Sequence, residues 1–145
     1  GLGDVYKRQV LNYGKQLNSF SKIQIRMCQD AIEDAKIMYE HGRFKNTLNR
    51  AYYAIFYAIR AVNATQSFDS SKHSGVIAFF NQHYVKTGIF PKEASKIIKE
   101  ASENRERADY LDFFIASKKD AEIQLAKAER FQALVTEYFK NKGIY

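Results

Sequence analysis

The chain has 145 residues, 46% of them hydrophobic, which is enough for one domain with a core of its own. Its 23 Lys and Arg residues against 16 Asp and Glu residues give a net charge of +7, which favours polyanions or acidic partners and otherwise indicates only a solvated basic surface. The single cysteine, Cys28, excludes an intrachain disulfide. Because no apolar run reaches the roughly 18 residues that a membrane span needs, and no signal peptide pattern is found, we expect a cytoplasmic protein without a membrane partner.

The hydrophobic residues are spaced by three and four along most of the chain, which predicts an all-α fold without strands. Residues 1–20 show no clear period and begin with glycine rather than methionine, so we expect the native start to be missing or altered. We therefore leave this segment out of the predicted fold. The remaining residues, 21–142, are expected to form a compact up-and-down bundle of about five helices.

The helices are expected at residues 21–40 and 43–63, around residues 76–84, from residue 91 to about 108, and from residue 117 to about 140. Asp69, Ser70 or Ser71, in the polar loop after the second helix, is expected to cap the third. Pro91 fits the first turn of the fourth helix. Ser117, followed three residues later by Asp120, resembles a capping box that opens the last helix.

The second helix has two distinct faces when its residues are placed at about 100° intervals. The core-facing stripe is expected to consist of Leu48, Tyr52, Ile55, Ile59 and Val62. The opposite face carries a polar and aromatic line made of Asn46, Arg50, Tyr53, Tyr57 and Arg60, with Asn49 at its edge. Small residues between the two faces allow close approach of another backbone at Ala54, Ala58 and Ala61.

The polar line has two interpretations. In the first, it is a buried seam at which arginines bind phosphates, tyrosines stack on bases, and two copies of the chain pair symmetrically as a homodimer. In the second, it is the solvent-exposed face of an ordinary amphipathic helix. Solvated faces usually carry Lys and Glu rather than Asn, Tyr and Arg in register, so residue usage favours the seam.

Several segments resemble one known family in order and spacing. Residues 42–58, Gly-Arg-Phe-Lys-Asn-Thr-Leu-Asn-Arg-Ala-Tyr-Tyr-Ala-Ile-Phe-Tyr-Ala, resemble the signature helix of HEPN proteins, in particular the group called UPF0332. Further similarity lies in residues 71–77 (Ser-Lys-His-Ser-Gly-Val-Ile), 80–88, 105–110 (Arg-Glu-Arg-Ala-Asp-Tyr) and 128–131. Together the resemblance covers about residues 22–139.

This resemblance implies a dimeric helical bundle whose partner is a minimal nucleotidyltransferase antitoxin and which, in many members, is a metal-independent ribonuclease toxin. The family's chemistry rests on an arginine followed, after four to six residues, by a histidine on the same helix. Arg50 matches the arginine, whereas Tyr57 stands at the histidine position. Because tyrosine titrates near pH 10, we expect cleavage by this route to be low or absent.

Two further motif segments add candidate residues. His73 can supply an imidazole if the fold brings it to Arg50, and the alternative is a capping or packing role. Arg105 and Asp109 are four residues apart, with Tyr110 beside them, and are expected to form a local ion pair rather than a catalytic group. RNA- or nucleotide-binding roles are assigned to Asn46, Asn49, Tyr53, Arg60 and His73.

Neither His41 nor His83 has metal-ligand spacing with Cys28, so no zinc site and no cofactor are expected. Three functions stay open. The first is an RNA-directed toxin that depends on Arg50. The second is a non-catalytic HEPN adaptor that binds RNA, nucleotide or its nucleotidyltransferase partner, and the resemblance makes Tyr57 or Tyr53 a candidate acceptor of AMP. The third is a structural adaptor whose polar seam only sets the register of a dimer.

Overall fold

The computed structural model describes residues 19–143. These residues form α-helices and one π-helical segment, without strands. The elements are α2 (Ser19–Glu40), α3 (Phe44–Ala64), α4 (His73–Phe80), the π-helical η1 (Asn81–Val85), α5 (Lys92–Tyr110) and α6 (Lys118–Asn141). The predicted all-α bundle is confirmed. The expectation for residues 1–20 falls almost wholly outside the described part of the chain.

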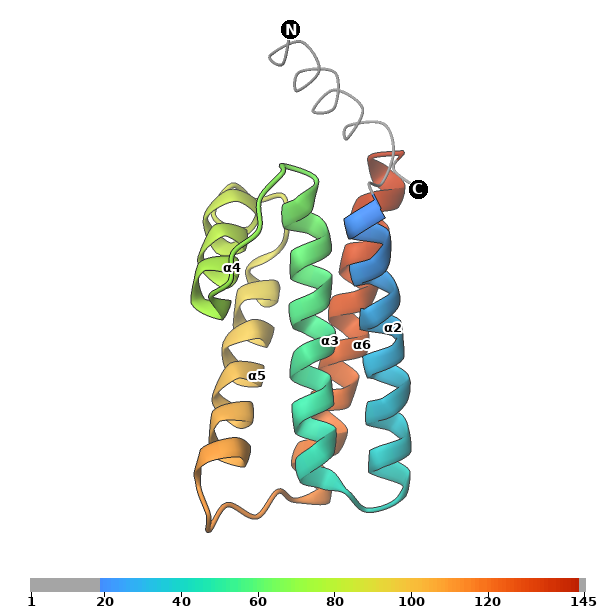
Figure 1. Cartoon of the computed structure of the whole chain (residues 1–145), viewed down its shortest axis with the longest axis vertical. Coiled ribbons are helices and arrows are strands. Elements are labelled where there is room, and N and C mark those ends of the chain that lie inside the picture. The colour runs from blue at the N-terminus through green and yellow to red at the C-terminus, as the bar shows by residue number, and fades with distance from the viewer. Residues whose placement is uncertain (1–18, 144–145) are drawn as a thin grey trace, which may run out of the picture.

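Helix α3 is the centre of the bundle and contacts α2, α4, α5 and α6. Figure 1 shows α2, α3 and α6 side by side along the long axis, with α5 on the other flank of α3 and α4 near the upper end of α5. Consecutive long helices run in opposite directions, as short connections require. The polar line predicted on α3 therefore lies on the one helix that touches every other helix of the described bundle.

The predicted core stripe of α3 is confirmed, because all five of its residues are buried. The small residues beside it, Ala54, Ala58 and Ala61, are also buried. The Ser21 hydroxyl of α2 donates a hydrogen bond of 3.0 Å to the carbonyl of Ala61, which shows how closely the two helices approach. Burying a large apolar side chain stabilises a fold by about 1.5–3 kcal/mol, so this stripe is a main source of stability.

The predicted helix starts are partly right. The Ser117 hydroxyl accepts a hydrogen bond of 3.0 Å from the Asp120 backbone amide and caps α6 as predicted. Pro91, however, precedes the first residue of α5 and occupies its N-cap instead of its first turn. An N-cap residue has non-helical backbone angles, and Pro91 is extended with ψ of 158°.

The predicted cap of α4 is wrong. Lys72 is the N-cap, and it makes no side-chain capping hydrogen bond. The Ser70 hydroxyl instead accepts a 3.2 Å hydrogen bond from the Lys72 backbone amide, and Asp69 is engaged with Arg60 of α3. The loop before α4 is thus fixed by a turn at Ser70 and by the ion pair between Asp69 and Arg60. The ion pair holds the loop, and with it the start of α4, against α3.

The α4–η1 segment is anchored to the C-terminal half of α3 by buried polar contacts. Asn63 donates its side-chain amide to the carbonyl of Val76 at 3.0 Å. The Tyr84 hydroxyl donates to the carbonyl of Val62 at 3.2 Å and lies 3.1 Å from the Thr65 hydroxyl. These contacts fix the position of His73, the first residue of α4, relative to α3.

Helix α5 extends to Tyr110, two residues beyond its predicted end. Large apolar side chains are exposed where α5 leads into α6, namely those of Tyr110, Leu111, Phe113 and Ile115. Within the described residues, no helix combines the length and the apolar character that crossing a membrane requires.

Candidate functional site

Tyr53 of α3 lies beside two arginines that come from different helices. The Arg50 guanidinium carbon is 5.1 Å from the centroid of the Tyr53 ring, and that of Arg105 in α5 is 5.5 Å away. Arg105 Nη2 also donates a hydrogen bond of 3.3 Å to the Tyr53 hydroxyl. Cations at these distances are attracted by the negative face of an aromatic ring. Two positive charges are therefore gathered around one partly exposed tyrosine.

Arg105 forms the ion pair predicted from its sequence spacing and also reaches further. Its Nε donates to Asp109 Oδ2 at 3.0 Å, as expected for residues four apart on a helix. Its guanidinium carbon also lies 5.0 Å from the centroid of the Tyr52 ring. The neighbouring Tyr110 side chain is 73% exposed. The sequence predicted the local pair but not that Arg105 joins α5 to the polar face of α3.

Within residues 19–143, Arg50 forms no ion pair with an acidic side chain. Its Nε and Nη2 both donate to Asn49 Oδ1, at 3.1 and 2.8 Å, so the neighbouring amide holds the guanidinium in place. A partly exposed arginine with its charge uncompensated and its orientation fixed is suited to bind an anion.

His73 lies against the same part of α3. The centroid of its ring is 4.2 Å from that of Phe56 and 5.9 Å from that of Tyr53, and its Nδ1 is 3.1 Å from the Tyr52 hydroxyl. Burial lowers the pKa of His73 below its usual 6.5, and the positive charges of Arg105 and Arg60 lower it further. The imidazole is therefore neutral near pH 7. When Nδ1 donates to Tyr52, Nε2 carries the free lone pair.

We refer to these residues as the tyrosine cluster, which consists of Arg50, Tyr52, Tyr53, Phe56, His73 and Arg105. Tyr57 borders the cluster, with its ring centroid 5.8 Å from that of Tyr53. The structure thus brings His73 and Arg50 to one aromatic ring, that of Tyr53, on which both pack. No direct contact between the two is described.

The two ends of the predicted polar line lie at or beyond the edge of the cluster. The guanidinium carbon of Arg60 is 5.9 Å from the centroid of the Phe56 ring. Arg60 forms a bidentate pair with Asp69, with bonds of 3.0 and 2.7 Å that compensate its charge. This pair also lowers the pKa of Asp69 through the hydrogen bond from Arg60. Asn46 donates to the sulfur of Met38 in α2 at 3.9 Å. The polar line is therefore divided, and only its middle part meets α4 and α5.

Sequence reasoning missed the roles of Tyr52 and Phe56. Tyr52 was assigned to the core stripe, and it is indeed only 3% exposed, but its hydroxyl orients His73. A signal was available, because a tyrosine at a core position brings a hydroxyl that needs a polar partner. Phe56 is 5% exposed and gave no such signal, since its contact with His73 depends on where α4 packs.

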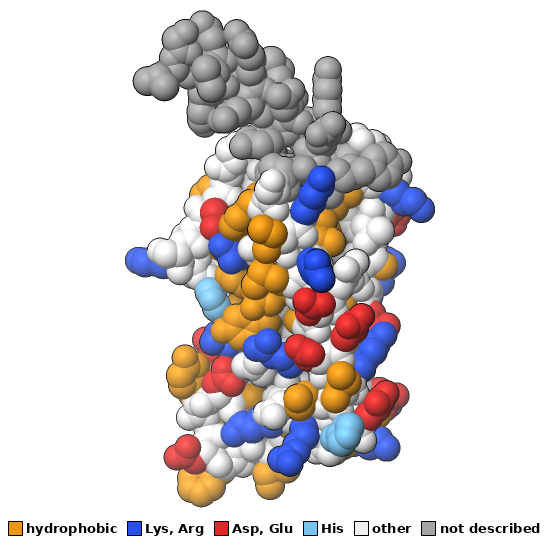
Figure 2. Space-filling model, turned by 45° about the vertical axis from the view of Figure 1, so that its right-hand side comes forward, with side chains coloured by type: hydrophobic (Ala, Val, Ile, Leu, Met, Phe, Trp, Pro, Cys, Tyr) orange, Lys and Arg blue, Asp and Glu red, His pale blue; other side chains and the backbone are white. Residues whose placement is uncertain are grey.

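The surface of the bundle mixes aromatic and basic groups. Figure 2 shows a face with a strip of hydrophobic side chains bordered by Lys, Arg, His, Asp and Glu side chains. Within the described residues, no group of three His, Cys, Asp or Glu side chains is placed to bind a metal ion. Cys28 is buried, as a small apolar residue would be, and burial raises the pKa of its thiol to about 12.

Comparisons with known proteins identify the family. A family model described as "HEPN domain" matches residues 22–138. A UPF0332 protein of Thermotoga maritima is 35% identical over 106 residues, which cover 73% of this chain and 80% of that protein. A Methanocaldococcus jannaschii protein named "Putative toxin" is 28% identical over 134 residues, covering 92% of this chain and 88% of that protein.

A second Methanocaldococcus jannaschii protein with the same name is 31% identical over 107 residues, which cover 74% of this chain and 79% of that protein. The signature helix singled out in the sequence corresponds to α3, which carries most of the tyrosine cluster. The family model spans most of the chain, and the Thermotoga relative spans more than two thirds of it above 30% identity. The chain therefore belongs to the HEPN family and is similar to its UPF0332 group.

Proposed function

We propose that this toxin-like HEPN protein binds RNA at the tyrosine cluster. The observation that carries the proposal is the placement of two guanidinium groups, from Arg50 and Arg105, beside the ring of Tyr53. Guanidinium groups bind phosphate oxygens, and exposed aromatic rings stack on bases. The net charge of +7 supports attraction of a polyanion.

Several residues in and beside the cluster have distinct parts in this proposal. Arg50, which pairs with no acidic side chain of the described residues, binds the phosphate nearest α3. Tyr53 and Tyr57 offer ring faces to unpaired bases, as single-stranded RNA requires. Arg105 shares its charge with Asp109 and so contributes less to the phosphate than Arg50 does. Asn49 keeps the Arg50 guanidinium in the binding orientation.

RNA binding is tested by fluorescence anisotropy of a labelled single-stranded RNA at low salt, where phosphate contacts are strongest. Arg50→Ala should weaken binding about tenfold or more, because a charge-assisted hydrogen bond is lost. Arg26→Ala, on the exposed face of α2, removes the same charge elsewhere and serves as the matched control. Equal affinities for the two variants would contradict the proposal.

Cleavage of the bound RNA is a second candidate function, favoured by the position of His73. In this route Nε2 of His73 accepts the proton of a ribose 2′-hydroxyl, and the 2′-oxygen attacks the adjacent phosphorus. The bond to the 5′-oxygen breaks, which leaves a 2′,3′-cyclic phosphate, and the departing oxygen takes up a proton. Arg50 stabilises the charge that develops on the phosphoryl oxygens. Tyr57 has no proton-accepting role in this route.

A metal-free cleavage assay in the presence of a chelator separates these functions. If His73 is the base, His73→Ala should lower the rate about 100-fold or more while RNA affinity changes little. Tyr57→His restores the family's arginine and histidine pair on α3 and should increase cleavage. A wild-type protein that binds RNA without cutting it, alongside an active Tyr57→His variant, would identify a binding module with a disabled nuclease site.

We also propose a homodimer formed across the partly exposed face of α3, and a minimal nucleotidyltransferase antitoxin as partner. The toxin names of the relatives support a neutralising partner. Sedimentation of wild type and of Tyr57→Asp tests the dimer, because a charge placed at the seam should favour the monomer. A dimer unaffected by Tyr57→Asp and Arg50→Ala, without RNA affinity at low salt, would instead fit a purely structural adaptor.

A further inference from the structure

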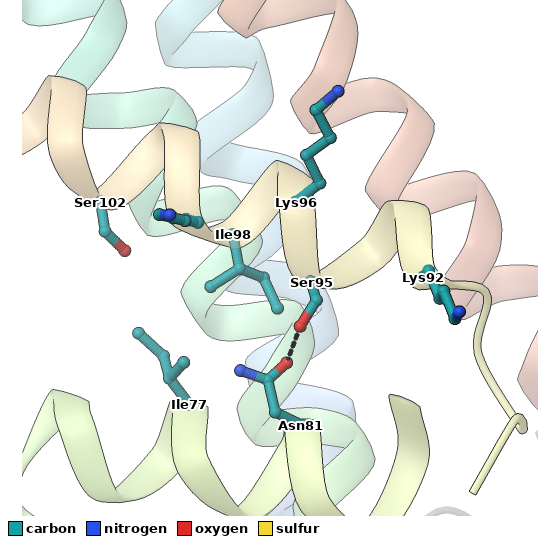
Figure 3. Close-up of a pocket in the computed structure, with 8 residues that line it drawn as sticks. Ile77, Asn81, Lys92, Ser95, Lys96, Ile98 and Ser102 are labelled. Carbon is teal, nitrogen blue, oxygen red and sulfur yellow. Dashed lines mark hydrogen bonds between the residues drawn. The ribbon is translucent and has the colours of Figure 1, made fainter. Parts of the chain in front are cut away.

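A second basic surface lies beside the tyrosine cluster, in a hollow of about 540 Å³ between α4–η1 and α5. Three lysines of α5 line it, Lys92, Lys96 and Lys99, together with Ser102 one turn further on. Figure 3 shows Asn81 on the opposite wall, with its side chain joined to Ser95. Among the described residues, no acidic side chain lines the hollow.

The uncharged polar groups of the hollow can also serve an anion. Ser95 donates its hydroxyl to Asn81 Oδ1 at 2.5 Å, so the amide nitrogen Nδ2 is the end of Asn81 that remains to donate to a ligand. The Ser102 hydroxyl oxygen is buried, and within the described structure it has no hydrogen-bond partner. A buried hydroxyl without a partner carries a desolvation cost that a bound acceptor removes.

The charges of the three lysines are not compensated within the described residues. Glu93 and Glu100 of α5 are engaged with α6 instead, where Glu93 binds Arg130 and Glu100 binds Lys127. Glu103, one turn beyond Lys99, takes part in none of the described ion pairs. Figure 3 shows the Lys96 side chain directed away from Ile77 and Asn81, so Lys92 and Lys99 are the two lysines left to serve a ligand in the hollow.

The hollow leads directly to the tyrosine cluster, because α4 and α5 are antiparallel along it. Asn81 contacts Ser95, and Ile77, one turn earlier in α4, lines the hollow with Ile98 and Ser102. One further turn places His73 on α4 beside Arg105 on α5. Both of these residues contact the rings of Tyr52 and Tyr53. At a rise of 1.5 Å per residue, the lysines lie about 9–20 Å along α5 from Arg105.

We propose that this hollow binds backbone phosphates of the RNA strand whose neighbouring nucleotide occupies the tyrosine cluster. The proposal rests on the proposed RNA-binding function and extends the site from α3 along α5. Ammonium groups on flexible side chains bind phosphates without contacting the bases. The hollow therefore suits a path for the RNA backbone, which we call the strand path, and not a pocket that selects a particular base. The isoleucine side chains of the hollow do not compete for the phosphate, and they pack against the sugar side of the strand.

The test compares two RNAs and two doubly substituted proteins. The RNAs are a dinucleotide, which fills only the tyrosine cluster, and a single strand of about ten nucleotides, within the usual range of single-strand sites. The variants are Lys92→Gln/Lys99→Gln in the hollow and Lys140→Gln/Lys142→Gln at the end of α6, which removes the same charge elsewhere. All four lysines are exposed, so thermal melting should show that both variants are folded.

The hollow variant should bind the longer RNA at least tenfold more weakly than the α6 variant and bind the dinucleotide equally well. The slope of log affinity against log salt should fall by about 1.4, since each single-strand phosphate contact contributes about 0.7. Equal affinity of the two variants for the longer RNA, together with loss of binding in Arg50→Ala, would overturn the strand path and leave the proposed function standing.

Two other results also contradict the strand path. Weaker binding of a mononucleotide or of inorganic phosphate by the hollow variant, without an effect on the longer RNA, would assign the hollow to a free phosphate ligand. Failure of the wild-type protein to bind either RNA at low salt would overturn the proposed function together with this extension of it.

Discussion

The hydroxyl of Tyr52 lies 3.1 Å from Nδ1 of His73, and this contact joins the middle of α3 to the first residue of α4. Burial raises the pKa of Tyr52, so the phenol remains protonated and able to hydrogen bond across the physiological range. The contact also fixes the orientation of the imidazole ring, because Nδ1 is engaged and Nε2 is left for a substrate. A core tyrosine thereby determines which histidine nitrogen can take part in chemistry.

The first prediction concerns the titration of His73. Its pKa should be below 6.5, mainly because of burial and secondly because Arg105 disfavours the protonated form. Arg105→Ala removes that positive charge and should raise the pKa, whereas Arg107→Ala on the exposed side of α5 should leave it unchanged. The measurement is an NMR titration of the imidazole protons. An identical pKa in the wild type and in both variants would show that Arg105 does not act on the imidazole.

The second prediction is the pH dependence of any cleavage. A general base must be unprotonated, so the rate should rise with pH through the pKa of His73 and level off above it. Since that pKa is lowered, the midpoint of the rise should lie below pH 6.5. A midpoint near pH 10 in the wild type would identify a tyrosine as the titrating group instead.

The third prediction tests the turn that positions His73. A Cβ atom added at Gly75 would lie 2.8 Å from the Ser70 hydroxyl oxygen, so Gly75→Ala requires the Ser70 side chain to move and disturbs the hydrogen bond that it accepts from the Lys72 amide. We expect a loss of about 1 to 3 kcal/mol in the free energy of unfolding, measured with urea, as for other overpacking changes. Adding Ser70→Gly, which removes the crowded atoms, should restore part of that loss. No recovery in the double variant would mean that the clash lies elsewhere.

The fourth prediction contrasts two serines that resemble helix caps in the sequence. Ser117→Ala removes the hydroxyl that accepts from the Asp120 amide and should cost about 1 kcal/mol of stability. Ser71→Ala should have almost no effect, because Ser71 is exposed and does not cap α4. Urea denaturation of both variants checks the contrast, and it would fail if Ser71→Ala were the more harmful change.

The fifth prediction uses Cys28 as a reporter of unfolding. Its side chain is buried, and the burial raises the pKa of the thiol to about 12, so the reactive thiolate is scarce in the folded protein. Iodoacetamide should therefore modify native protein far more slowly than urea-unfolded protein, as followed by mass spectrometry. Rapid modification of the native protein would indicate that α2 opens locally away from α3.

The helices could be predicted from the sequence, because the spacing of apolar residues within each helix identifies the face that is buried. The five core residues of α3 are an example, since their spacing alone places them on one side. The Arg105 and Asp109 pair is another, because both partners lie on one helix. Such features depend on neighbours within a few residues and need no knowledge of the tertiary arrangement.

The candidate site could be predicted only in part, because it is assembled by packing between distant segments. Arg105 meets Tyr53 across 52 positions of sequence, and His73 meets Tyr52 across 21. Whether the imidazole reaches α3 depends on how the loop after α3 folds, and that loop is held by the pair between Arg60 and Asp69. The predicted cap of α4 was wrong for the same reason, since the Asp69 carboxylate binds Arg60 of α3 instead of the first turn of α4.

The π-helical geometry of η1 constrains the number of residues between its two anchoring side chains, Asn81 and Tyr84. Side chains three residues apart are neighbours on one face of an α-helix, whereas a π-helix, with its wider turn, spreads them around the axis. Asn81 can thus reach α5 while Tyr84 reaches the end of α3. This short helix thus has two anchors on different neighbouring helices. A deletion between them would restore a regular turn and detach one anchor, so gaps should be selected against in this segment during evolution.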